Sequence, residues 1–210
     1  MKLKEIGIIP FSNSLLQMVY PANKSIAAKA KRLEDKGEII RLKRGLYVAS
    51  NEITDRIINE FLIANHLHGP SYVSMHSALR FYGIIPERVF EITSMTPRHA
   101  KTYTNKIGRF SYVHCSEEYY SIGLRSMEEN EINFMIASPE KALCDTMIYT
   151  PNLNLRYQSE IKTYLEENLR ADMQEIANFD LEILRECSEK GKKQRMIQQL
   201  IKFIQNERHI

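Results

Sequence analysis

The chain has 210 residues, of which 43% are hydrophobic and 26% charged. This composition excludes disorder along the whole chain, and the length predicts one or two domains. No apolar run approaches the roughly eighteen residues that mark a transmembrane helix, and the N-terminus lacks the pattern of a secretory signal. Three widely spaced cysteines fit neither a disulfide framework nor a CxxC metal site. We therefore expect a cytoplasmic, reduced protein with no membrane segment.

The net charge of +3 conceals an uneven distribution along the chain. Residues 1–50 hold ten Lys or Arg against four Asp or Glu, residues 51–150 hold nine against twelve, and residues 151–210 hold ten of each. A concentrated basic segment attracts polyanions, because its contact with a phosphate backbone releases condensed counterions. The basic first quarter therefore favours a nucleic-acid partner, although a merely solvated basic surface would have the same composition.

The first part of this basic segment predicts two helices. Residues 12–19 (SNSLLQMV) form a short helix, and residues 23–36 (NKSIAAKAKRLEDK) form a second, basic one. The apolar positions of the second helix share one face: Ile26, Ala30 and Leu33. Asn23 or Ser25 suits the N-cap, and Gly37 suits the C-terminal stop. Two short helices around a tight connection are typical of a helix-turn-helix.

A basic hairpin follows the second helix. Residues 38–48 (EIIRLKRGLYV) predict two short strands, and Gly45 supplies the positive φ that the turn requires. Tyr47 is expected to pack in the core or against the hairpin. The order helix, basic helix, basic hairpin predicts a winged helix-turn-helix in residues 1–50. In such a module the second helix enters the major groove of DNA while the wing touches the backbone.

Eleven positions of this module are candidate DNA contacts. Base edges would be read by the N-terminal half of the second helix, namely Asn23, Lys24, Ser25, Ala28 and Lys29. Phosphates would be contacted by the remaining basic residues, namely Lys31, Arg32, Lys36, Arg41, Lys43 and Arg44. The same pattern also fits a module that binds protein only, and this alternative stays open.

Residues 51–210 predict a second, α+β domain with a helical C-terminal part. The expected helices cover residues 54–67, residues 75–82 with Ser74 as the cap, a segment that starts at Ser138-Pro139, and the polar amphipathic region from residue 161 onward. The expected strands cover residues 72–73, 89–95, a short piece near Tyr103, 107–115, 119–122 and 132–136. The sequence has no internal repeat or low-complexity run.

The sequence contains no pattern typical of a catalytic or metal site. The histidines lack an HExxH motif, and His114 and Cys115, adjacent in a predicted strand, point to opposite faces of the sheet. Glu140 and Lys141 are adjacent rather than in the E-x-K spacing of common nucleases. Asp145 is expected to be a surface or polar-contact residue. We therefore predict a protein that is not an enzyme and has no catalytic residue, metal or cofactor.

A second, weaker basic cluster lies between two predicted strands. It consists of Arg98, His99 and Lys101 in the stretch TPRHAK, together with Lys106 and Arg109. The simpler interpretation is a solvated hairpin tip. The alternative is a ridge that contacts an acidic groove of a partner or DNA.

Three stretches resemble the AbiEi family of antitoxins from type IV toxin–antitoxin systems. They are RLKRGLYV (41–48), SYVSMHSALRFYGIIPERVFEITSMTPRHAKTYTNKIGRFSYVH (71–114) and IASPEKALCD (136–145), and the likeness covers most of residues 11–150. The resemblance implies a winged helix-turn-helix that binds inverted repeats in its own promoter. It further implies a C-terminal domain that counteracts a nucleotidyltransferase-like toxin without a stable complex. The DNA contacts that it implies are Lys24, Lys29, Arg32, Arg41, Lys43 and Arg44.

The sequence thus predicts an antitoxin that binds double-stranded DNA and represses its own operon, with two copies on a palindromic site. A protein–protein adaptor whose winged helix never touches DNA is the second hypothesis. A nuclease-type enzyme with a DNA-binding head is the third, and it would depend on Asp145 or Glu140.

Overall fold

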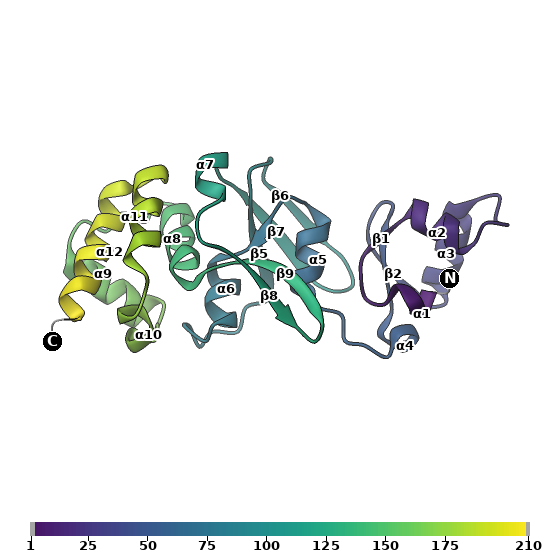
Figure 1. Cartoon of the computed structure of the whole chain (residues 1–210), viewed down its shortest axis with the longest axis horizontal. Helices are drawn as coiled ribbons and strands as arrows, with labels where there is room; N and C mark the ends of the chain where they lie inside the picture. The colour runs from purple at the N-terminus through teal and green to yellow at the C-terminus, as the bar shows by residue number, and fades with distance from the viewer. Residues whose placement is uncertain (1–2, 209–210) are drawn as a thin grey trace.

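The computed structural model of the protein describes residues 3–208, so the outer ends of the two predicted domains, residues 1–2 and 209–210, lie outside the described part. Helices and strands are mixed along the chain, which confirms the predicted α+β class. The molecule is elongated. The N-terminal elements form one end, a six-stranded sheet lies in the middle, and the C-terminal helices form the other end (Figure 1).

The N-terminal elements follow the order helix, strand, helix, helix, strand, strand. They are α1 (Leu3–Ile6), β1 (Phe11–Ser12), α2 (Asn13–Val19), α3 (Ile26–Asp35), β2 (Ile39–Lys43) and β3 (Leu46–Ala49). The three strands form an antiparallel sheet of order β1-β3-β2, in which β2 and β3 are the two strands of the predicted hairpin. This is the element order expected of a winged helix-turn-helix.

Local chemistry explains the bounds of these elements. The Ser25 side chain caps α3 by accepting a hydrogen bond from the Ala28 amide (3.4 Å), so the structure selects Ser25 rather than Asn23 as the cap. Gly37 ends the helix with φ of +72°, and Gly45 forms the hairpin turn with φ of +76°. A small separate core holds the helices to the sheet: Leu3, Phe11, Leu16, Ala30, Leu33, Ile39, Tyr47 and Ala49. The prediction that Tyr47 packs in the interior is confirmed.

The central sheet has six strands in the order β6-β7-β5-β4-β9-β8. Its strands are β4 (Tyr72–Val73), β5 (Glu91–Thr96), β6 (Lys101–Thr104), β7 (Arg109–His114), β8 (Leu124–Glu129) and β9 (Ile132–Ala137). Its parallel pairs are β5 with β7 and β4 with β9, and the other neighbours are antiparallel. The helices associated with it are α5 (Glu60–Leu67), α6 (Met75–Phe81), α7 (Glu117–Tyr120) and α8 (Pro139–Tyr149), whereas α4 (Asn51–Thr54) packs against α1 of the N-terminal module.

Two predictions about this region are wrong, and one strand was not predicted. The helix expected from residue 54 begins at residue 60, because Asp55 takes a left-handed conformation and Asn59 caps the amides of Phe61 and Leu62. Residues 119–122 do not form a strand, because Ser116 starts the short helix α7 there. Strand β8 has polar side chains on both of its faces, so its sequence lacks the alternation of apolar and polar residues that predicts a strand. Its pairing with β9 makes it one.

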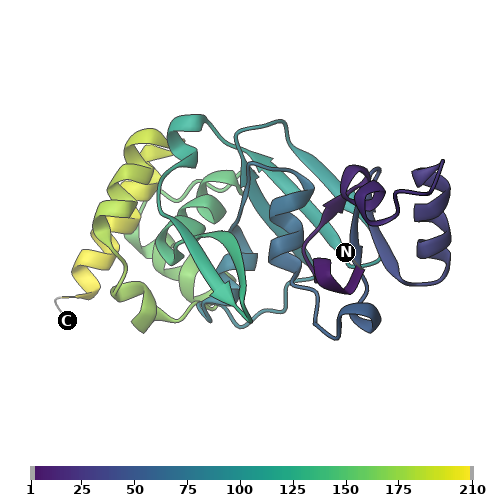
Figure 2. The same ribbon diagram turned by 45° about the vertical axis from the view of Figure 1, so that its right-hand side comes forward.

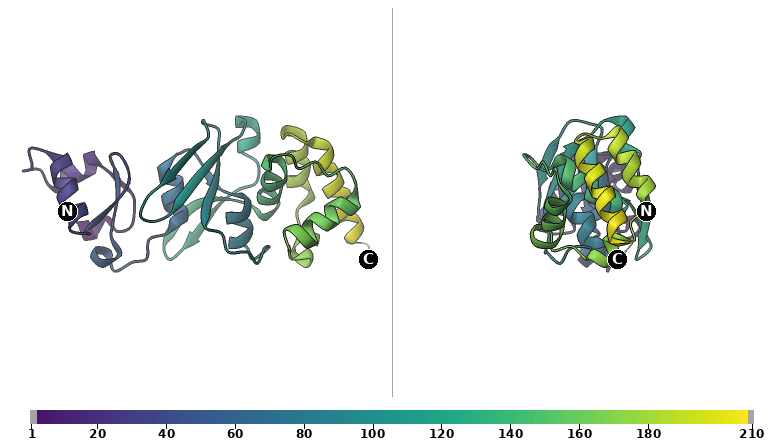
Figure 3. Two further views of the ribbon diagram at one scale, coloured as in Figure 1. Left: turned by 180° about the vertical axis from the view of Figure 1, so that it is seen from behind. Right: turned by 90° about the vertical axis from the view of Figure 1, so that its left-hand side faces the viewer.

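The C-terminal part is helical, as predicted, and covers one end of the molecule. Figure 3 (right) looks directly onto these helices. They are α9 (Gln158–Thr163), the π-helical turn η1 (Tyr164–Asn168), α10 (Met173–Ala177), α11 (Leu181–Lys190) and α12 (Gln194–Glu207). Helix α11 packs against α8, and α12 packs against α9, α10 and α11. The apolar positions of α12 join the same core as the sheet.

The hairpin β2–β3 packs against the central part of the molecule. Leu42 and Val48 are buried in the core that includes the six-stranded sheet, and not in the small N-terminal core. The Lys43 ammonium donates to the Leu67 carbonyl (2.5 Å), and the Asn105 amide donates to the Leu42 carbonyl (3.2 Å). The hairpin side of the N-terminal module therefore faces the sheet, and α2 and α3 lie on the side away from it (Figure 1).

None of the helices in residues 3–208 is long and apolar enough to cross a membrane. Cys115, Cys144 and Cys187 are all buried and free. Burial raises the pKa of the Cys115 thiol to about 12, so this thiol stays protonated near neutral pH.

We expect the three native cysteines to react with a thiol-specific disulfide reagent at pH 8 only after the protein is unfolded in guanidinium chloride. Burial denies the reagent access, and for Cys115 it also suppresses the thiolate that must attack. The release of the coloured thiolate is measured by absorbance. The control is Ser126→Cys, at an exposed position of β8, which adds one thiol that reacts in the native state. Fast reaction of a native cysteine would contradict the packing of the core.

Candidate nucleic-acid interface

Helix α3 presents one face to the interior and the opposite face to solvent. Its buried positions, Ala30 and Leu33, pack in the small N-terminal core. The opposite face is exposed and consists of Ala27, Ala28, Lys31, Arg32 and Asp35. Figure 2 shows α3 at the right-hand, outer end of the molecule, and the central sheet lies between α3 and the C-terminal helices. No element of the described chain therefore obstructs this face.

Arg44, in the hairpin turn, is exposed and has no carboxylate partner within residues 3–208. The same is true of the three cations on or beside the exposed face of α3, namely Lys24, Lys31 and Arg32. Lys24 precedes the capped start of α3, where the unpaired amides of the first turn carry a partial positive charge. Ala28 lies among these cations and has the smallest side chain that a helix tolerates without loss of stability. The surface therefore combines positive charge with room for close approach of an anionic backbone.

Other predicted contacts are held by neighbours within the N-terminal module. The Lys29 ammonium lies 4.1 Å from the centroid of the Tyr20 ring, and the Asn23 amide donates to the Tyr20 carbonyl. Arg41 forms an ion pair with Glu34 (2.7 Å). Lys36 lies 3.9 Å from the Glu38 carboxylate and remains well exposed. These side chains border the exposed face of α3, but each already has a partner within the module.

Lys43 does not lie with the other candidate contacts. Its ammonium is directed away from α3, toward the Leu67 carbonyl and the Tyr103 ring of the central part. Sequence position alone placed it at the tip of the wing, and the packing of the hairpin against the sheet turns it inward. We therefore leave Lys43 out of the candidate interface.

The exposed face of α3 is thus the core of the candidate interface. Lys24, Lys31 and Arg32 come from one short segment, and Arg44 comes from the hairpin turn. Ser25 is exposed, but its hydroxyl already caps the helix. A basic, protruding helix of this kind is suited to contact phosphates and the edges of bases in a wide groove.

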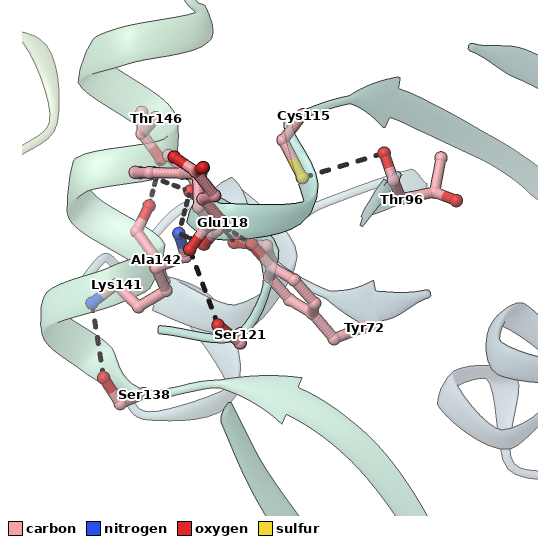
Figure 4. Close-up of polar contacts among 12 residues, drawn as sticks. Tyr72, Thr96, Cys115, Glu118, Ser121, Ser138, Lys141, Ala142 and Thr146 are labelled. Atoms are coloured by element: carbon pink, nitrogen blue, oxygen red, sulfur yellow. Dashed lines mark hydrogen bonds and ion pairs between the residues drawn. The ribbon is translucent and has the colours of Figure 1, made fainter. Parts of the chain in front are cut away.

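Asp145 lies in the interior, where sequence analysis had allowed a surface position. It is fully buried and accepts hydrogen bonds from the hydroxyls of Ser74 (2.6 Å), Tyr119 (2.8 Å) and Tyr72 (3.2 Å). The Lys141 ammonium, also fully buried, lies 3.4 Å from the carboxylate and donates to the Tyr119 carbonyl (2.9 Å). Figure 4 shows Lys141 on its helix beside Tyr72 and the segment that holds Glu118 and Ser121.

These contacts join α8 to β4, α7 and the start of α6. Ser74 occupies the N-cap position of α6, as predicted, but its side chain makes no capping bond because it donates to Asp145 instead. Burial, and then the negative charge of Asp145, holds the pKa of the Tyr72 and Tyr119 phenols well above its usual value. Both phenols therefore remain hydrogen-bond donors, and the carboxylate has four donors around it.

One local feature of the sequence indicates part of this cluster. Lys141 and Asp145 are four residues apart within an otherwise apolar helix, a spacing that lets an ion pair form on one helical face. The tyrosines and Ser74 come from distant parts of the chain, so no local pattern could identify them.

The carboxylates considered for a nuclease have structural contacts. Glu140 is 6% exposed, and one of its oxygens accepts a hydrogen bond from the Asp180 amide (3.1 Å). Neither described pocket is lined by Glu140 or Asp145. His114 is exposed and Cys115 is buried, which confirms that the two side chains diverge. Within residues 3–208, no three His, Cys, Asp or Glu residues are grouped so as to hold a metal ion.

A pocket of about 580 Å³ lies where the N-terminal module meets the central part. It is lined by Ile8, by the segment 56–61 that connects the two parts, and by residues of α6 and the β8–β9 turn. Ile57, one of the lining residues, is 84% exposed. Glu60 and Glu129 add negative charge to the lining, and Arg56, which is paired with Glu131, adds a positive charge.

No protein-family model matches this chain, and no curated protein is significantly similar to it. The family resemblance therefore rests on the three sequence stretches alone.

We expect Asp145→Ala to lower the free energy of unfolding by about 3–5 kcal/mol, because removing one member of a buried pair leaves the Lys141 charge and three hydroxyls without their acceptor. Urea denaturation followed by circular dichroism measures this. The matched control is Glu189→Ala, which removes an exposed carboxylate of α11 and should change stability by less than about 0.5 kcal/mol. Equal effects of the two changes would show that the cluster does not stabilise the fold.

Proposed function

We propose that this protein binds double-stranded DNA through the exposed face of α3 and is not an enzyme. The observation that carries the proposal is the group of unpaired cations around Ala28 at the outer end of the molecule. Lys24, Lys31 and Arg32 are exposed together, and the helix that bears two of them protrudes from the body. The element order of residues 3–49 is that of modules in which this helix enters the major groove.

The resemblance to the AbiEi antitoxins supports a more specific role. The protein is a cytoplasmic antitoxin of a type IV toxin–antitoxin system, which binds inverted repeats in its own promoter and represses its operon. An inverted repeat requires two recognition helices, so two copies bind one site. The remaining domain counteracts a nucleotidyltransferase-like toxin without a stable complex. The hydrogen bonds that Asp145 and Glu140 accept within the fold support the proposal that the protein is not an enzyme.

A protein–protein adaptor is the second candidate function, and the pocket at the junction is the observation that favours it. Exposed Ile57 and the acidic lining fit a partner segment that carries an apolar side chain next to a basic one. In this alternative the winged helix does not contact DNA. A gel shift with the region upstream of the protein's own gene separates the two functions, because an adaptor fails to bind even at low salt.

We expect Ala28→Glu to weaken binding to this upstream duplex by at least about tenfold, because it places a carboxylate among the cations that face the phosphates. Glutamate is a good helix former, so α3 remains intact. The matched control, Gln198→Glu on the exposed side of α12, adds the same charge at the opposite end and should leave affinity unchanged. Fluorescence anisotropy measures both, and equal affinities for the two variants would reject α3 as the binding element.

For the antitoxin role, we expect expression of a neighbouring nucleotidyltransferase-like gene to arrest growth and co-expression of this protein to restore it. Separate inducible promoters for the two genes keep repression of the operon out of the measurement. Growth curves give the result. A neighbouring gene product whose toxicity is unaffected by this protein would contradict the antitoxin role while leaving DNA binding intact.

A further inference from the structure

A second group of exposed cations lies on the central sheet, at the edge nearest the hairpin β2–β3. Strand β6 is the edge strand, and Lys101 is its first residue. Arg98 precedes it and Lys106 follows it in the turn to β7. All three are exposed and have no carboxylate partner within the described residues. Arg109, the other basic residue of the predicted cluster, is paired with Glu91 (3.1 Å).

Direct contacts place this group beside the hairpin. The ammonium groups of Lys43 and Lys101 lie 5.7 Å and 5.1 Å from the centroid of the same ring, that of Tyr103. Next to Lys106, the Asn105 side chain donates to the Leu42 carbonyl of β2 (3.2 Å) and fixes the β6–β7 turn with its own carboxamide oxygen. Lys101 and Lys106 therefore lie beside the hairpin.

Protection of the sheet edge explains only part of this arrangement. A lysine on an edge strand discourages pairing with a strand of another molecule, and this accounts for Lys101. Arg98 and Lys106 lie outside β6, so the same reason does not account for them. Placing unpaired cations along one edge of the sheet carries a small electrostatic cost in water, and a polyanion that spans them removes this cost.

We propose that Arg98, Lys101 and Lys106 form a second DNA contact, which binds the sugar–phosphate backbone of the same duplex beyond the part contacted by α3 and Arg44. This inference rests on the proposed function. The hydrogen bonds of Lys43 and Asn105 and the burial of Leu42 hold the hairpin against the sheet, so the two basic surfaces keep a fixed relation. The partner is a phosphate backbone rather than an acidic protein, because the group adjoins the hairpin that a winged module uses for backbone contacts.

The test is the affinity of the full-length protein for the duplex upstream of its own gene, measured by fluorescence anisotropy between about 50 and 200 mM salt. The variant is Lys101→Ala/Lys106→Ala. Its matched control is Lys190→Ala/Lys202→Ala, which removes two exposed, unpaired lysines from α11 and α12 at the other end of the molecule. Both double variants change only exposed side chains, and circular dichroism verifies their folding.

We expect the β6 variant to bind on the order of tenfold more weakly than the control, with the log–log salt slope reduced by about 0.9 for each lysine removed. The arginine version, Lys101→Arg/Lys106→Arg, should bind like the native protein. Shortening the duplex at the end that extends beyond α3 toward β6 should abolish the difference in affinity between the β6 variant and the control.

Unchanged affinity and slope in the β6 variant, with Ala28→Glu still impaired, would overturn this second contact and leave the proposed function standing. Loss of binding to an acidic protein, without any change in DNA affinity, would also overturn it. Absence of DNA binding by the native protein at low salt would reject the proposed function, and this inference with it.

Discussion

The packing of the hairpin β2–β3 against the six-stranded sheet determines which face of the N-terminal module is exposed to solvent. Leu42 and Val48 point from the hairpin into the larger core, and Lys43 and Asn105 add hydrogen bonds across the junction. Because one side of the N-terminal module is used in this way, α3 is left on the other side, at the outer end (Figure 2). Removing apolar surface from water supplies most of the driving force for such a junction, and the hydrogen bonds fix its orientation.

Charge and packing divide the basic residues of the first fifty positions into two groups. Lys24, Lys31, Arg32 and Arg44 are exposed without a carboxylate partner in the described chain, whereas Arg41 is paired and Lys43 is turned toward the sheet. An exposed ion pair contributes little to stability, so Glu34 does not remove Arg41 from reach of a phosphate. The half-buried contact of Lys43 is different, because its ammonium already has a carbonyl acceptor within the protein.

The interior of the larger part has a constraint of its own. A fully buried carboxylate costs free energy unless donors surround it, and Asp145 has three hydroxyls and an ammonium. These donors come from β4, the start of α6, α7 and α8, so the cluster fixes how those elements meet. Asp145 and Lys141 thus have a structural role, and the nearby Glu140 accepts a hydrogen bond from the Asp180 amide.

The sequence by itself determined the elements that depend on local chemistry. The capped helix α3, the hairpin around Gly45 and the helix after Ser138-Pro139 follow from side chains that act within a few residues of each other. Their residues also predicted the exposed face of α3. Only the tertiary structure decided the direction of Lys43, the burial of Asp145 and the existence of β8, because each depends on groups far away along the chain. A helical or alternating pattern shows which face is apolar, but not which other element will cover it.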